Sequence, residues 1–238
     1  MCRETKRGFS LLEMMFAVAL FALLMIMVFA FFQYATRSFQ LASVRQGIQS
    51  DGLRVMNSLQ GDLRRTAEST ITLEARPATV TVDGATPRRD AISVAGLYNW
   101  NDASNTDNFD PGTGQPRWNR YIVYYATRNE EGGHLYKLVL EPAPPPVAPV
   151  PLPLTELQDN SKDDPSLNIF QGGNPAFVQL ARNVQEFSFE NKSGTIVVHL
   201  TLRERRGARP NSASGSGVEV FELVTAVRPE NTYPSTKF

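Results

Sequence analysis

The chain has 238 residues, in which 24 Lys plus Arg balance 24 Asp plus Glu, so the formal net charge is zero. This length allows a membrane anchor and one domain with a core of its own. A neutral balance argues against a general nucleic-acid binder, which is usually basic. The single cysteine, Cys2, excludes a disulfide framework, and two histidines leave little room for a histidine-based metal site. We therefore expect no cofactor and no metal.

The first expected element is a long apolar helix at residues 9–32. Between Phe9 and Phe32 the only charged residue is Glu13, and neither Pro nor Gly interrupts the run. A helix of this length spans about 36 Å, which is enough for a hydrocarbon core of about 30 Å. Basic residues outnumber acids before the run, so the positive-inside bias predicts a single-pass anchor with a cytoplasmic N-terminus and the head outside the cytoplasm. Those residues are Arg3, Glu4, Lys6 and Arg7.

The end of the apolar run does not resemble the end of a secretory signal. The run is longer than a secretory core, and no A-x-A-like cleavage site follows before Gln33. A lipoprotein signal would need a cysteine after the run, and the sequence has none there. If a segment is removed, we expect it to be the basic head at residues 1–8.

Glu13 needs an explanation, because an acid at the centre of a membrane helix costs about 2.5–3.5 kcal/mol and less near an end. One interpretation is an acid tolerated close to the membrane surface, where it reaches the headgroups. The other is a functional group that pairs with a cation when the helix leaves the lipid. An unpaired buried carboxylate is costly, whereas an ion pair is strong at low dielectric.

The residues around Glu13 resemble the class III signal of type IV prepilins. That family has a short basic leader that ends in Gly, followed by Phe, with Glu as the fifth residue of the mature chain. Gly8, Phe9 and Glu13 stand in this register. The resemblance implies that a prepilin peptidase cuts between Gly8 and Phe9 and methylates the new amine of Phe9. It also implies that Glu13 pairs with the N-terminal amine of a neighbouring subunit and sets the axial register of a filament.

The helix is expected to continue beyond the membrane over residues 33–68. Apolar residues recur there at steps of three and four, which is typical of an amphipathic helix that lies against a sheet. Glycines at positions 47, 52 and 61 weaken the helix locally. The apolar positions are Leu41, Val44, Ile48, Val55, Met56, Leu59, Leu63 and Ala67.

Residues 69–238 are expected to form a β-rich head, because the apolar pattern changes to a period of two. Turn residues at 129–133 and 191–194 predict two hairpin connections. A helix followed by antiparallel strands predicts an α+β, pilin-like fold with the helix packed on the sheet. The expected strands are 70–76, 79–83, 90–97, 120–127, 134–141, 184–190, 194–204 and 218–228.

The order of several head segments resembles that of J-type minor pseudopilins of type II secretion, and W-type minor pilins look similar. The last strand usually ends in Arg-Asn in such proteins, whereas Pro229 and Glu230 intervene here. The resemblance implies a subunit of the inner membrane that joins other minor and major pilins or pseudopilins at a filament tip. A membrane-anchored enzyme would need a constellation of catalytic residues, which the sequence does not offer, so we expect no enzymatic activity. The segments are 121–125, 135–139, 183–189 and 227–231.

Three polar or proline-rich segments are candidates for a role other than connecting strands. Residues 142–153 contain seven prolines and predict an extended, solvated loop that continues through 155–175, or alternatively a recognition arm for a partner. Residues 99–110 are rich in Asx oxygens, which calcium prefers, although their spacing does not fit an EF-hand and a surface loop is the default. Serines and glycines at 211–217 predict a flexible hairpin tip and not a nucleophile elbow.

A basic run lies just before that tip. Arg203, Arg205, Arg206 and Arg209 predict either a solvated strand end or a contact with DNA or a surface. This run is the sole support for an alternative function, a minor pilin whose head binds DNA or a surface. His134 and His199 lack ligand-like neighbours in the sequence, so we expect both to be sheet histidines with satisfied hydrogen bonds.

Overall fold

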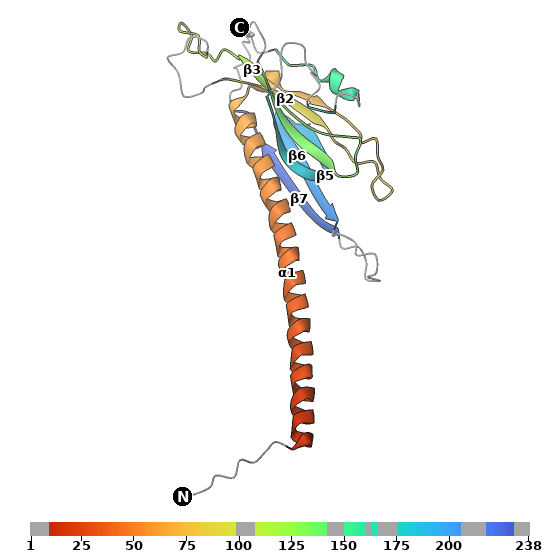
Figure 1. The fold of residues 1–238 in the computed structure, drawn as a ribbon. Coiled ribbons are helices and arrows are strands. Elements are labelled where there is room, and N and C mark those ends of the chain that lie inside the picture. Colours follow the sequence, from red (N-terminus) through yellow and green to blue (C-terminus); the bar gives the residue numbers. More distant parts are fainter. Residues whose placement is uncertain are drawn as a thin grey trace, which may run out of the picture. The chain divides into compact units, whose positions relative to one another are not determined.

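The computed structural model describes residues 10–98, 108–141, 150–159, 163–165, 176–205 and 218–230. The helix α1 (Leu11–Arg65) runs without a break and is followed by strands (Figure 1). The strands are β1 (Thr72–Glu74), β2 (Ala91–Gly96), β3 (Arg120–Ala126), β4 (Gly133–Leu140), β5 (Ala176–Lys192), β6 (Thr195–Arg205) and β7 (Val218–Val227), and the 3₁₀ helices are η1 (Glu68–Thr70) and η2 (Thr155–Gln158).

The chain divides into two units, Met1–Gln46 and Gly47–Phe238, each considered by itself. In the second unit, α1 buries one face of its last turns. The buried positions follow the three- and four-residue steps of an amphipathic helix, as the sequence pattern predicts. They are Ile48, Gly52, Val55, Met56, Leu59 and Leu63.

The strands form one antiparallel sheet in which each strand pairs with its neighbours in sequence, in the order β1-β2-β3-β4-β5-β6-β7. Short connections produce this meander. Ser193 and Gly194, at φ 53° and 82°, form the two-residue turn between β5 and β6, where positive φ at both positions matches the strand twist. One helix and an antiparallel sheet confirm the expected α+β, pilin-like fold.

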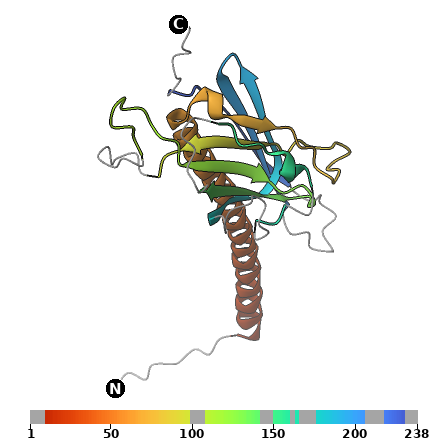
Figure 2. The ribbon, with the colours of Figure 1, turned by 90° about the horizontal axis from the view of Figure 1, so that it is seen from above.

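The sheet is curled, and the long strand β5 is where it bends. Asn183 lies in the left-handed region at φ 56°, and the pairing register of β5 shifts on both sides of it. The first half of β5 pairs with β4 and the second half with β6, while Arg89 makes a parallel bridge to Phe187. Figure 2 shows the result, since the green strands run across the view and the blue strands run steeply.

One face of the sheet packs against α1. Phe221 of β7 and Leu202 of β6 lie against Gly52, where a Cβ atom would sit 2.6 Å from the Phe221 ring. The Gln60 side chain donates to the Thr225 hydroxyl at 2.6 Å, farther along the same strand. Glycine at position 52 therefore lets the helix approach the sheet closely.

The other face is covered by residues 150–157, which we call the strap. Leu154 and Leu157 of the strap are buried in a cluster with Val123, Tyr125 and other sheet residues, and Leu152 packs against it. The Tyr121 hydroxyl donates to the Val150 carbonyl at 2.8 Å. The predicted solvated excursion is therefore wrong at the buried Leu154 and Leu157, which cover part of the apolar sheet face, whereas Val150, Pro151 and Pro153 are exposed as predicted.

Two of the strand predictions also need correction. Residues 79–83 are not a strand, because Val82 and Ala85 exchange backbone hydrogen bonds across a tight turn. Asp83 and Gly84 occupy that turn at φ 50° and 82°, and Asp-Gly is a sequence signal for it. The strand expected at 184–190 begins earlier, at Ala176, because its first half pairs with β4.

The close approach at Gly52 can be tested by adding one methyl group. Gly52→Ala should lower the free energy of unfolding of the head by about 1–3 kcal/mol, because the new Cβ overlaps the Phe221 ring. Gly61→Ala is the matched control, since no atom lies within 4 Å of its added Cβ and Ala favours the helix. Denaturant unfolding of the detergent-solubilised protein measures both. Equal effects of the two substitutions would contradict the packing.

Candidate functional site

The first turn of α1 holds Glu13 in a capping box. The Ser10 backbone N–H donates to Glu13 Oε2 at 2.9 Å, and the Glu13 backbone N–H donates to Ser10 Oγ at 3.3 Å. The two residues thus satisfy two donors that a helix N-terminus leaves without partners. The negative charge also lies where the helix dipole favours it. The Ser-x-x-Glu spacing was readable in the sequence, but sequence reasoning considered only Glu13.

The predicted processing residues, Gly8 and Phe9, lie outside the described residues, so cleavage and methylation there stay predictions. Glu13 is exposed, and its contact with Ser10 uses one carboxylate oxygen. The carboxylate can therefore reach a cation beyond its own helix. Its predicted pairing with a neighbouring subunit also stays a prediction.

The first unit presents an apolar surface that it does not cover itself. Every residue from 10 to 40 is exposed, and Glu13 and Arg37 are the charged residues among them. Among the described helices, α1 contains a segment long and apolar enough to cross a membrane, none of which is buried. The Thr36 hydroxyl donates to the Phe32 carbonyl at 2.8 Å, so this polar group is satisfied within the helix. An apolar surface of this kind requires lipid or other helices around it.

Comparison with known proteins agrees with this geometry. The family model described as the prokaryotic N-terminal methylation motif matches residues 4–29, a range that includes Gly8, Phe9 and Glu13. No curated protein and no solved structure matches the chain. The motif indicates a type IV pilin-like or pseudopilin-like protein. It implies processing by a prepilin peptidase and assembly with other pilins, and with the apolar helix it fits a single-pass inner-membrane protein.

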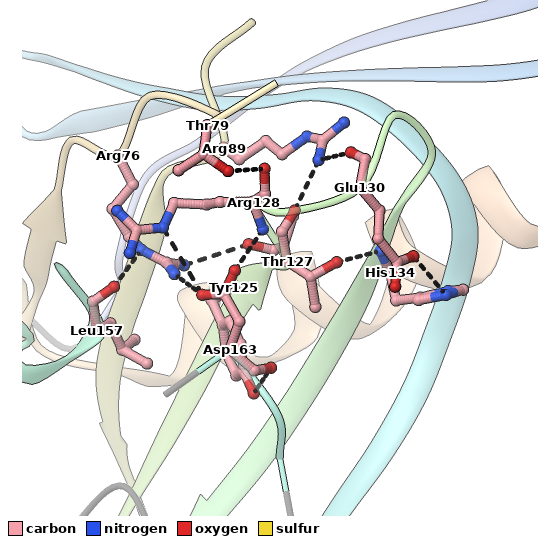
Figure 3. Close-up of polar contacts among 11 residues, drawn as sticks. Arg76, Thr79, Arg89, Tyr125, Thr127, Arg128, Glu130, His134, Leu157 and Asp163 are labelled. Atoms are coloured by element: carbon pink, nitrogen blue, oxygen red, sulfur yellow. Dashed lines mark hydrogen bonds and ion pairs between the residues drawn. The ribbon is translucent and has the colours of Figure 1, made fainter. Parts of the chain in front are cut away.

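The head contains a buried polar cluster around Asp163 (Figure 3). Arg76 Nη2 donates to Asp163 Oδ1 at 2.5 Å, and the Arg128 backbone N–H donates to Asp163 Oδ2 at 2.5 Å. Arg76 also donates to the carbonyls of Leu157 at 2.8 Å and Ala126 at 3.2 Å. Burial lowers the pKa of Arg76 to about 10, and Asp163 opposes that shift. Arg76 therefore stays charged at neutral pH and fastens the strap to β3.

Arg89, at the top of Figure 3, makes a similar connection. Its Nη1 donates to the carbonyls of Thr127 at 2.8 Å and Glu130 at 2.5 Å, and its Nη2 donates to the Glu131 carbonyl at 2.7 Å. Burial lowers the pKa of Arg89. The acceptors are backbone carbonyls of the β3–β4 connection, so Arg89 holds that loop rather than a ligand.

A second polar set joins α1 to the sheet within the head. Asp62 of the helix accepts hydrogen bonds from Lys137 Nζ at 2.6 Å and from the Tyr124 hydroxyl. The Ser58 hydroxyl lies 2.8 Å from the Tyr124 hydroxyl. Burial, and then Asp62, raise the pKa of Tyr124, which keeps it protonated as a donor. This set fixes the position of the helix along β3 and β4.

The predicted loop sites fall mostly outside the described residues. Residues 99–107 of the Asx-rich segment and 142–149 of the proline-rich segment lie outside the described residues. Asp110 is described, and its Oδ1 accepts the backbone N–H groups of Gly112 at 2.8 Å and Thr113 at 3.1 Å, which lower its pKa. Among the residues that the structure describes, no three His, Cys, Asp or Glu side chains are grouped as metal ligands.

The predicted basic run is seen only at Arg203, since the Arg205 side chain and residues 206–217 lie outside the description. Arg203 Nη1 forms an ion pair with Asp83 Oδ2 at 2.6 Å, and its side chain is only 12% exposed. The prediction of a solvated arginine is therefore wrong here, because the Asp83 turn reaches the end of β6.

The two histidines lie on strands, as expected. His134 Nδ1 is 3.1 Å from the Gln179 amide nitrogen, and His134 Nε2 is 3.3 Å from a Glu130 carboxylate oxygen. His199 lies on β6, where its buried Nε2 has no hydrogen-bond partner among the described residues. The expectation of satisfied hydrogen bonds therefore holds for His134 and is wrong for His199.

The buried cluster predicts a large effect at Asp163. Asp163→Ala should lower the free energy of unfolding by about 3–5 kcal/mol, because it leaves the buried Arg76 without its counter-charge. Glu156→Ala is the control, since Glu156 is an exposed acid of the same connection. Denaturant unfolding compares the two, and a loss at Asp163 no larger than at Glu156 would contradict the predicted role.

Proposed function

We propose that the chain is a minor pseudopilin or minor pilin, a structural subunit rather than an enzyme. It joins other subunits at a filament tip and helps to initiate assembly of a pseudopilus or pilus for protein secretion. The observation that carries this proposal is the exposed apolar half of α1, which has a carboxylate in its first turn and whose first part, up to residue 29, matches the methylation motif.

The physical argument begins with the exposed apolar residues. A helix that is apolar on all sides is stable in lipid or in a bundle of similar helices. In such a bundle an unpaired carboxylate is costly, and a neighbouring amine removes that cost. Glu13 therefore favours arrangements in which its carboxylate lies beside the N-terminal amine of Phe9 in another subunit. This pairing sets the axial register and makes assembly specific.

The minor, J-type or W-type role is supported by the head. Three of the four segments on which the resemblance rests lie on β3, β4 and β5, and the fourth, 227–231, begins at the end of β7. The basic leader supports an orientation with the N-terminus in the cytoplasm and the head outside. A head that binds DNA or a surface is the alternative; of the four arginines on which it rests, the structure describes the side chain of Arg203, which is paired with Asp83.

Processing is tested by mass spectrometry of the protein after expression with a prepilin peptidase. We expect a mature chain that begins with N-methylated Phe9. An intact Met1, or cleavage after residue 32, would refute the proposal and leave only a membrane-tethered α+β domain.

The role of Glu13 is tested by separating its charge from its capping bond. Glu13→Gln removes the charge, but Gln can keep the capping box with Ser10. We expect it to insert normally into the membrane and to enter filaments at least tenfold less, as expected for a loss of about 1.4 kcal/mol or more. Sheared filaments and membranes, compared by immunoblot, measure incorporation.

Ser10→Ala provides the matched control, because it removes the cap and keeps the charge. The loss of a cap costs about 1 kcal/mol, so its effect should be smaller than that of Glu13→Gln. If Glu13→Gln enters filaments as well as the parent protein does, the carboxylate has no role in assembly.

A further inference from the structure

We propose that Tyr34, Arg37 and Phe39 form an interfacial collar that binds the outer headgroups of the membrane and sets the depth of α1. The collar places Glu13 at the inner boundary of the hydrocarbon. Any outward movement of the subunit then draws the Glu13 carboxylate into lipid. This inference rests on the proposed function, because it takes α1 as a membrane span with its N-terminus inside.

The first argument is the length between two charges. Glu13 and Arg37 bracket the segment 14–36, which contains no charged residue. At 1.5 Å per residue these 23 residues span about 35 Å, against a hydrocarbon core of about 30 Å. The segment therefore fills the membrane with little length to spare. When one bracketing charge lies at a headgroup region, the other must lie near the opposite one.

The second argument is the chemistry of the collar. Tyr34 is 71% exposed and Phe39 is 75% exposed, and Arg37 is also exposed. Aromatic rings with a polar group favour the membrane interface, and an arginine side chain can extend from the helix to a lipid phosphate. Tyr34 and Arg37 lie one turn apart on the same face of the helix, while Phe39 lies on another. Tyr34 and Arg37 therefore supply the polar contacts with the interface, and Phe39 adds an apolar ring on another face of the helix.

The depth set by the collar determines when Glu13 needs a charged partner. Tyr34 lies 21 residues, or about 32 Å, from Glu13 along the helix. At rest the carboxylate is therefore at the inner headgroups, and its capping bond to Ser10 is compatible with water nearby. The cost of an acid in a membrane helix rises toward the bilayer centre. Glu13 therefore needs a neighbouring amine only when the subunit moves outward and its carboxylate enters the hydrocarbon. In this way the extraction of the helix from the membrane is coupled to the pairing of Glu13.

The depth can be measured by cysteine labelling of the full chain. Cys2 is the only cysteine, so single cysteines can be introduced into a Cys2→Ser background. A membrane-impermeant maleimide is added to the outside of spheroplasts that express Val18→Cys, Phe29→Cys or Ser38→Cys. We expect labelling at position 38 and protection at positions 18 and 29.

The collar itself is tested in the Ser38→Cys background. Replacing Tyr34 and Arg37 together by Leu should lower the labelling of position 38 at least fivefold, because the longer apolar run sinks inward. Gln40→Leu is the matched control, since it replaces an exposed polar residue one turn beyond Arg37 and should leave the labelling unchanged.

Each remaining outcome overturns a defined part of the inference. Labelling at position 29 would place Glu13 inside the hydrocarbon at rest, and protection at position 38 would place it in the cytoplasm. Unchanged labelling in the double variant would show that other residues set the depth. Labelling at all three positions would show that α1 does not span the membrane, and the proposed function would fail with the collar.

Discussion

The constraint on which the rest of the structure depends is the cost of exposing an apolar helix to water. The half of α1 in Met1–Gln46 has exposed apolar side chains on every face, and none of the described residues from 10 to 40 is covered. The half in Gly47–Phe238 buries its apolar stripe against the sheet. One continuous helix therefore solves the same problem in two ways, by packing within the chain and by contact with lipid or other subunits.

The charged residues differ between the two units in the same way as the apolar ones. In the head, the buried Asp163 faces Arg76, and the half-buried Asp62 faces Lys137, so both carboxylates have a counter-charge within the chain. Such pairs give little net stability, but each is costly to break, so they specify one arrangement of strap, helix and sheet. Glu13 differs because its internal partner, the Ser10 amide, carries no charge. A carboxylate whose partner among the described residues is uncharged is suited to an external cation.

Local patterns were sufficient to predict much of the fold and the methylation motif that residues 4–29 match, while the roles of Gly8, Phe9 and Glu13 stay predictions. Helical spacing predicted the buried stripe from Ile48 to Leu63, and turn residues predicted the hairpin at Ser193 and Gly194. Contacts between distant segments were not predictable in this way. The burial of Leu154 and Leu157 depends on a strap that returns to β3, and the Arg203–Asp83 pair joins residues far apart in sequence. No local period encodes such contacts.

This difference also explains why the sequence of the N-terminal unit indicates function more clearly than the sequence of the head does. The head is stabilised by its own core, so most of its sequence is explained by packing. Its described charged clusters pair within the head and hold its elements together. The N-terminal half gains stability only from its surroundings, so each of its polar residues must be compatible with lipid, water or a neighbouring subunit. Within residues 10–40 the charged positions are Glu13 and Arg37. The distance between these two charges along the helix is close to the thickness of a membrane, so the spacing of the charges in this unit matches the environment that we propose for it.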